Sequence, residues 1–120
     1  MVPLAKDRDR LTVFADQFAC PSSARGIAEG LLMITTQCQS RASIAWGTYH
    51  YCQKLYVSWH KFAEAIVARA IEKGMVDHKV EVAPIPSFEF PTPVMRPKYS
   101  NLSTEKLASE LGSKCASWRN

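Results

Sequence analysis

The sequence lacks the patterns that mark several large classes of protein. Its five glycines build neither the Gly-x-Gly-x-x-Gly turn nor the phosphate loop that nucleotide-binding proteins need. No apolar run approaches the length that spans a membrane, and residues 28–34 are interrupted by Glu29 and Gly30. The net charge of +4 comes from scattered Lys and Arg side chains with no dense basic block. We therefore expect no membrane span and no nucleic-acid partner.

Cysteine patterns that hold metals or form disulfide frameworks are also missing. The four cysteines are widely spaced, no Cys-x-x-Cys pair occurs, and only Cys52 stands close to a histidine, His50. Five charged residues in a row, at positions 6–10, follow the start of the chain and leave no room for the apolar core of a signal peptide. We expect reduced cysteines with small apolar roles, no metal site and a cytoplasmic protein.

The remaining composition is that of a single globular domain covering residues 1–120, with 47% hydrophobic and 22% charged residues. Hydrophobic periodicity and turn residues predict alternating strands and helices, and the segment at 37–45 is predicted to be a polar loop. The predicted strands cover 11–14, 48–52 and 80–83, and the predicted helices cover 23–36, 57–74 and 103–112. A serine at 22 or 23 and Ser103 are the expected N-caps. This order predicts an α/β fold with helices covering a small sheet.

Arg96 is the most distinctive candidate for ligand binding. Prolines 86, 91, 93 and 97 stiffen the backbone on both sides of it, because proline fixes its own φ and restricts the preceding residue. A guanidinium on a stiff loop can hold a phosphate or carboxylate by two parallel hydrogen bonds. The alternative interpretation is a proline-rich connector with a solvated arginine.

Asp16 and Gln17 are the second candidates, because they stand where a predicted strand ends and the chain turns toward a helix. Ligands of α/β folds gather at that edge of the sheet. The alternative is an aspartate that only stabilises its own turn. Candidates for catalysis are missing: Tyr51 and Lys54 are three residues apart, not the four that place a lysine beside a proton-donating tyrosine. We assign no catalytic residue.

Three segments together resemble the dTDP-4-dehydrorhamnose reductase family of extended short-chain dehydrogenases. They are residues 14–25 (FADQFACPSSAR), residues 47–50 with 58–66 (GTYH and SWHKFAEAI), and residues 90–107 (FPTPVMRPKYSNLSTEKL). The similarity covers nearly the whole chain in order. One departure is Ala19, which stands where the family usually has glycine.

The resemblance implies that the chain is the C-terminal, substrate-binding part of such an enzyme. It implies a small mixed sheet with covering helices, including a strand and a helix that normally join the nucleotide-binding sheet. The N-terminal Rossmann half, with its glycine-rich turn and Tyr-x-x-x-Lys pair, is absent from the sequence. Family members reduce dTDP-4-dehydro-L-rhamnose to dTDP-L-rhamnose with NADPH or NADH.

By this resemblance, Asp16, Gln17 and Arg96 would hold the dTDP-sugar. The chain would bind no nicotinamide cofactor itself, and it would not catalyse alone. Its expected partners are the missing nucleotide-binding half or a second copy of the chain. The alternative function is a non-catalytic regulatory module, because the regulatory β subunit of methionine adenosyltransferase resembles the same reductases.

Overall fold

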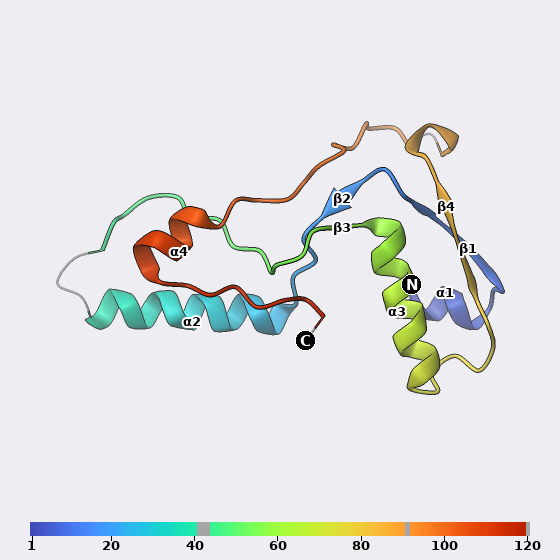
Figure 1. The fold of residues 1–120 in the computed structure, drawn as a ribbon, viewed down its shortest axis with the longest axis horizontal. Coiled ribbons are helices and arrows are strands. Elements are labelled where there is room, and N and C mark those ends of the chain that lie inside the picture. The colour runs from blue at the N-terminus through green and yellow to red at the C-terminus, as the bar shows by residue number, and fades with distance from the viewer. Residues whose placement is uncertain (41–43, 91, 120) are drawn as a thin grey trace. The chain divides into compact units, whose positions relative to one another are not determined.

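The fold is described from a computed structural model, which covers residues 1–40, 44–90 and 92–119 (Figure 1). The chain forms two compact units, each made from two separate segments of sequence. The first unit is Met1–Ala19 with Val57–Ser100, and the second unit is Cys20–Tyr56 with Asn101–Asn120. The described helices include none with the length and apolarity that crossing a bilayer requires.

The first unit is built on a parallel pair of strands, β1 (Arg10–Phe14) and β4 (Glu81–Ile85), in which Leu11 lies opposite Val82. The connection between these strands contains α3 (Trp59–Glu72), which packs on both of them, and α1 (Val2–Lys6) packs against α3 and β1 (Figure 1). A second, antiparallel pair joins β2 (Phe18–Ala19) to β3 (Val57–Ser58). The predicted α/β class is confirmed, with helices beside a small amount of sheet that includes both a parallel and an antiparallel pair.

The core of the first unit explains why these elements form. Leu11 of β1 and two residues on one stripe of α3 meet a residue of α1 and two valines of the α3–β4 connection in a single apolar cluster. The cluster consists of Ala5, Leu11, Val67, Ala70, Val76 and Val80. The helix predicted at 57–74 begins two residues late, because Val57 and Ser58 are taken into β3 and Ser58 becomes the N-cap. Its Oγ accepts a hydrogen bond from the backbone N–H of Lys61 at 3.2 Å.

The strand predicted at 80–83 extends past Pro84 to Ile85. Proline is tolerated inside a strand when its missing N–H would face an unpaired edge. Here the N–H of Glu81 donates to Asp9 and the carbonyl of Ile85 accepts from Ala15, so the odd-numbered residues face β1. Pro84 therefore faces the other edge and no β1–β4 hydrogen bond is lost.

The second unit contains α2 (Ala24–Ser40) and α4 (Glu105–Leu111). Ser23 acts as the predicted N-cap of α2, because its Oγ accepts from the backbone N–H of Gly26 at 3.0 Å. The loop predicted at 37–45 is wrong up to Ser40, since the helix continues one further turn through residues that include no glycine or proline. Positions 41–43 of that loop lie outside the described residues.

The strand predicted at 48–52 is wrong, because that segment has no strand pairing in the structure. Its β-prone side chains pack instead: Tyr49 and Tyr51 contact the buried cluster of Leu107, Leu111 and Cys115. The helix containing Leu107 and Leu111, α4, begins two residues later than predicted. Its N-cap is Thr104, and the Ser103 Oγ still accepts from the N–H of Glu105 at 3.4 Å. The predicted stop at Gly112 is confirmed by its left-handed φ of 65°.

Candidate functional site

A pocket of about 380 Å³ lies in the first unit, beside the carboxyl ends of the parallel strands. Both Gln17 and Arg96 line this pocket, although they come from different segments of the chain. The other lining residues are Met1, Thr12, Val13, Phe14, Trp59, Ile85 and Phe90. The structure thus brings two of the three predicted residues together at the edge where ligands of α/β folds gather.

Gln17 is held firmly in the turn that follows β1. Its side chain is buried, and Nε2 donates a hydrogen bond of 2.8 Å to the Oγ of Ser87. Its backbone carbonyl accepts from the N–H of Trp59 at 3.0 Å. Both ends of the residue are therefore fixed before any ligand arrives, which lowers the conformational entropy that binding would remove.

Asp16 is half-buried and does not line the pocket. Its carboxylate accepts two hydrogen bonds from Ser87, one from the backbone N–H at 2.9 Å and one from Oγ at 2.8 Å. The backbone bond, followed by the hydroxyl bond, lowers the pKa of Asp16 below its ordinary value of 3.8. The direct ligand contact predicted for Asp16 stays a prediction. In the structure its carboxylate is bonded to Ser87, which also contacts Gln17.

Arg96 stands on a segment that is tied back to β2. The N–H of Phe18 donates to the carbonyl of Lys98 at 2.8 Å, and the N–H of Ser100 donates to the carbonyl of Phe18 at 3.0 Å. The rings of Phe18 and Tyr99 stack with their centroids 5.5 Å apart. This bridge anchors the chain two residues after Arg96.

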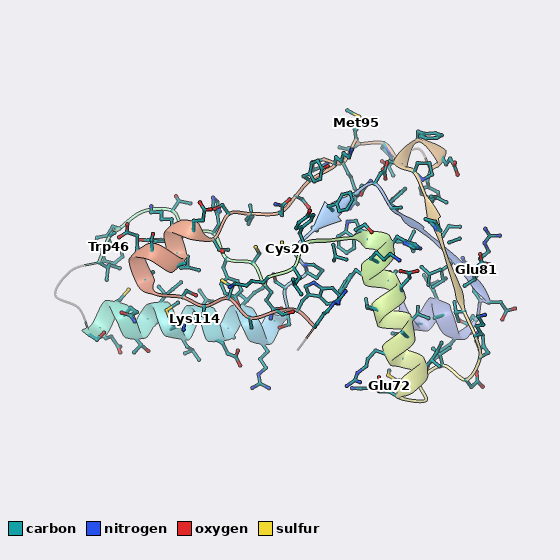
Figure 2. All side chains as sticks on the ribbon, in the orientation of Figure 1. Cys20, Trp46, Glu72, Glu81, Met95 and Lys114 are labelled. Atoms are coloured by element: carbon teal, nitrogen blue, oxygen red, sulfur yellow. The ribbon has the colours of Figure 1, made fainter. Side chains whose placement is uncertain are left out.

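The guanidinium of Arg96 is exposed, and within the described residues it has no hydrogen bond or ion pair. The preceding residue, Met95, extends outward from the same segment (Figure 2). Arg96 therefore lines the pocket with all its donors available, in an arrangement suited to an anionic group.

Two side chains at the site were missed by the sequence analysis. Trp59 has the spacing of a core residue, yet it is 37% exposed and lines the pocket, with its ring 6.0 Å from that of Phe62. Ser87 lies 70 positions from Gln17, and no sequence signal links the two. Ser58 as an N-cap could have placed Trp59 at the first turn of α3, but nothing in the sequence shows that this turn opens into a pocket.

The residues that line the pocket are mostly apolar and aromatic, and its polar side chains are those of Thr12, Gln17 and Arg96. Trp59, Phe14 and Phe90 offer ring faces and edges, with the rings of Phe14 and Phe90 6.1 Å apart. Such a pocket fits a molecule that has a flat apolar part and a negative charge. Across residues 1–40, 44–90 and 92–119 no group of three metal-ligating side chains occurs. A second cavity, of about 280 Å³ in the second unit, contains none of the predicted residues.

Comparison with known proteins supports one family. The model of the RmlD substrate binding domain matches residues 1–120. The dTDP-4-dehydrorhamnose reductase of Burkholderia thailandensis is 39% identical over 124 residues, which cover 99% of this chain and 42% of that protein. The reductase of the same name from Aggregatibacter actinomycetemcomitans is 32% identical over 119 residues, covering 99% of this chain and 40% of that protein.

Solved structures give the same result. A dTDP-4-dehydrorhamnose reductase from Clostridium acetobutylicum superposes with a TM-score of 0.81 and 31% identity, covering 98% of this chain and 38% of that one. The enzyme from Bacillus anthracis, solved in complex with NADP, gives a TM-score of 0.76 and 28% identity. This match covers 98% of this chain and 38% of that one. The chain thus spans about two fifths of the length of the relatives that it matches.

Proposed function

This chain belongs to the RmlD substrate binding domain family, and on that basis we propose that it binds the dTDP-sugar of a dTDP-4-dehydrorhamnose reductase. The parent reaction is the reduction of dTDP-4-dehydro-L-rhamnose to dTDP-L-rhamnose. The chain serves as the C-terminal part of that enzyme, and we propose the cytoplasm as its location. The regulatory-module alternative is not favoured, because the relatives from Burkholderia thailandensis and Aggregatibacter actinomycetemcomitans carry the name of the reductase.

The observation that supports the proposal is that Gln17, Arg96 and Trp59 line the same pocket. Arg96 supplies the charge for the pyrophosphate, since a guanidinium pairs with phosphate oxygens through parallel hydrogen bonds. Trp59 offers a face on which a flat base can stack. Gln17 supplies a fixed polar group for a hydroxyl or an N–H of the ligand. The volume of about 380 Å³ fits part of a sugar nucleotide, with the rest in solvent or against another part of the enzyme.

The nicotinamide cofactor belongs, in this proposal, to the part of the longer relatives that this chain does not match. The cofactor supplies the hydride that reduces the ketone, and one related structure contains NADP. The described residues of this chain offer no glycine-rich turn at a strand end for the pyrophosphate of a dinucleotide. Its own residues bind and orient the sugar nucleotide. The nucleotide-binding half, or a second copy of this chain, is the proposed protein partner.

Titration calorimetry with dTDP-L-rhamnose and with dTDP tests the proposal. We expect saturable binding of both, weakened about tenfold or more by Arg96→Ala and less by Arg96→Lys, which keeps the charge but loses the planar fork. Arg69→Ala is the matched control, because Arg69 pairs with Glu72 on α3 and does not line the pocket. Absence of binding to the wild-type chain at millimolar ligand would overturn the proposal.

A second test concerns turnover. The chain alone should not oxidise NADPH in the presence of dTDP-4-dehydro-L-rhamnose, because it offers neither a dinucleotide turn nor a tyrosine–lysine pair for proton transfer. Absorbance at the nicotinamide band follows the reaction. Oxidation that depends on the keto sugar would contradict the assignment of this chain to substrate binding alone.

A further inference from the structure

Asp16, Ser87 and Gln17 form a row of hydrogen bonds that runs from the turn after β1 to the residue that opens η1 (Ser87–Glu89). Ser87 is the centre of the row. Its backbone N–H and its hydroxyl both contact the Asp16 carboxylate, at 2.9 and 2.8 Å, and its Oγ lies 2.8 Å from the Gln17 side-chain amide. Two of the three family-derived site residues therefore share one partner.

The direction of each hydrogen bond follows from counting protons. A carboxylate has no proton to donate, so the Ser87 hydroxyl must donate its only proton to Asp16. The Ser87 Oγ can then act toward Gln17 only as an acceptor. The amide of Gln17 must present its NH₂ group to Ser87, and its carbonyl Oε1 must lie on the other side. The number of protons available therefore fixes the orientation of the Gln17 amide.

We propose that Asp16, acting through Ser87, sets the polarity of Gln17 so that its Oε1 faces the pocket as an acceptor for a hydroxyl or N–H of the ligand. Asp16 and Ser87 are positioning residues in this scheme, and Gln17 is the contact. The role in binding rests on the proposed function, and the hydrogen-bond row itself does not.

The consequence is a specificity for ligands that carry a donor at one point and an anion at another. Arg96 offers only donors, and Gln17 so oriented offers an acceptor, which gives the two ends of the pocket opposite character. If the ligand instead placed an acceptor atom against Gln17, neither that atom nor Oε1 would have a proton to share. No hydrogen bond would form between them, and the ligand would bind more weakly. The donor has two possible sources in a dTDP-sugar, the N–H of the thymine ring and a hydroxyl of the sugar.

Binding measurements on three variants test the role of the row. Ser87→Ala removes the acceptor for the Gln17 NH₂ group and should weaken dTDP-L-rhamnose binding by about threefold to tenfold, and Ser87→Thr should restore it. Asp16→Asn places an NH₂ group next to Ser87, which frees the serine proton to turn toward Gln17. The amide of Gln17 then reverses, and the loss should be at least as large as that of Ser87→Ala.

The two donor sources are separated by comparing ligands. An equal loss for dTDP and dTDP-L-rhamnose in Ser87→Ala assigns the contact to the nucleotide, and a loss confined to dTDP-L-rhamnose assigns it to the sugar. Ser109→Ala on α4 is the control, because its Oγ donates a hydrogen bond to the carbonyl of Lys106 in its own helix and, among the described residues, to nothing else. The inference is overturned if folded Ser87→Ala binds both ligands as tightly as wild type while Arg96→Ala binds them weakly. In that case the proposed function still holds.

The orientation of the Gln17 amide can also be measured directly by NMR, without ligand and on the wild-type chain. In the wild-type chain, NMR should show the side-chain NH₂ of Gln17, identified by its disappearance in Gln17→Glu, with an NOE to the β protons of Ser87. One of its two protons should be shifted downfield by the hydrogen bond. An NH₂ pair at random-coil positions without that NOE would overturn the polarity assignment, whatever the outcome of the binding experiments.

Discussion

Asp16 and Ser87 lie 71 positions apart in the sequence, yet two hydrogen bonds, of 2.9 and 2.8 Å, join the carboxylate to the backbone N–H and the hydroxyl of the serine. The bonds connect the turn after β1 to the start of η1, which follows β4. They therefore close the end of the parallel pair at which the pocket lies. Because both bonds stabilise the charged carboxylate, this connection depends on pH.

The first prediction concerns acid stability. The pKa of Asp16 is lowered in the folded state, so its contribution to stability is present above its unfolded pKa of 3.8 and is lost as the pH falls through the folded pKa. Urea denaturation between about pH 2 and about pH 6 should show that wild type loses stability over the acid part of this range more steeply than Asp16→Asn. Parallel curves for the two proteins would contradict this assignment.

The parts of the fold that the sequence predicted depend on local chemistry. The strand at Arg10–Phe14, the capping of α2 by Ser23 and the end of α4 at Gly112 each follow from a few neighbouring residues. The segment at 48–52 fails for the opposite reason. Its β-branched and aromatic residues favour a strand, but no strand lies beside it, and Tyr51 packs on α2 instead. The helix α1 (Val2–Lys6) was missed because five residues carry little periodic signal.

The candidate site was predictable only in part. Arg96 and Gln17 stand out because of the prolines around one and the strand end before the other, and the pocket brings them together. The role of Ser87 depends on the register between β1 and β4, which places Phe14 opposite Ile85. A register between strands so distant in sequence is set by tertiary packing, so neither the serine nor the exposure of Trp59 could be read from local patterns.

The second prediction concerns the contact between α2 and Tyr51. A Cβ atom at Gly30 would lie 2.8 Å from Cε2 of the Tyr51 ring, which itself packs on the buried core of the second unit. Gly30→Ala gains about 1 kcal/mol in helix propensity, but displacing the packed ring costs about 1–3 kcal/mol. We expect a net loss of about 1 kcal/mol in the free energy of unfolding.

The control for this prediction is a double-mutant cycle. In a Tyr51→Ala background the ring is absent, so Gly30→Ala should stabilise the protein by up to about 1 kcal/mol. The sign of the effect therefore reverses with the tyrosine. Stabilisation by Gly30→Ala in both backgrounds, measured by urea denaturation, would show that the ring moves aside without cost.

The third prediction concerns thiol reactivity. Burial, followed by the neighbouring Cys52, raises the pKa of Cys20 to about 11, and the thiolate is the reactive form. At about pH 8 the folded chain should therefore be alkylated at Cys20 by iodoacetamide more than about a hundredfold more slowly than the same protein in denaturant. Mass spectrometry of the peptide that contains Cys20 measures both rates. Equal rates would mean that neither burial nor the neighbouring Cys52 thiol slows the reaction of Cys20.

The last prediction concerns His78, which precedes β4 and contacts two aspartates. Its Nδ1 lies 3.0 Å from the carboxylate of Asp77, and its Nε2 lies 3.7 Å from that of Asp9. The hydrogen bond to Asp77 is the main cause that raises the pKa of His78 above 6.5. A raised pKa means that the stabilisation is complete below the unfolded value and is lost as the pH rises through the folded one.

Wild type should therefore lose stability relative to His78→Gln as the pH rises from about 5.5 to about 8.5, as measured by urea denaturation. The matched control is His50→Gln, since His50 is exposed in the second unit and has no ion pair within the described residues. That variant should keep the pH dependence of wild type. If His50→Gln removes the dependence and His78→Gln preserves it, the charge pairing before β4 does not stabilise the parallel strands.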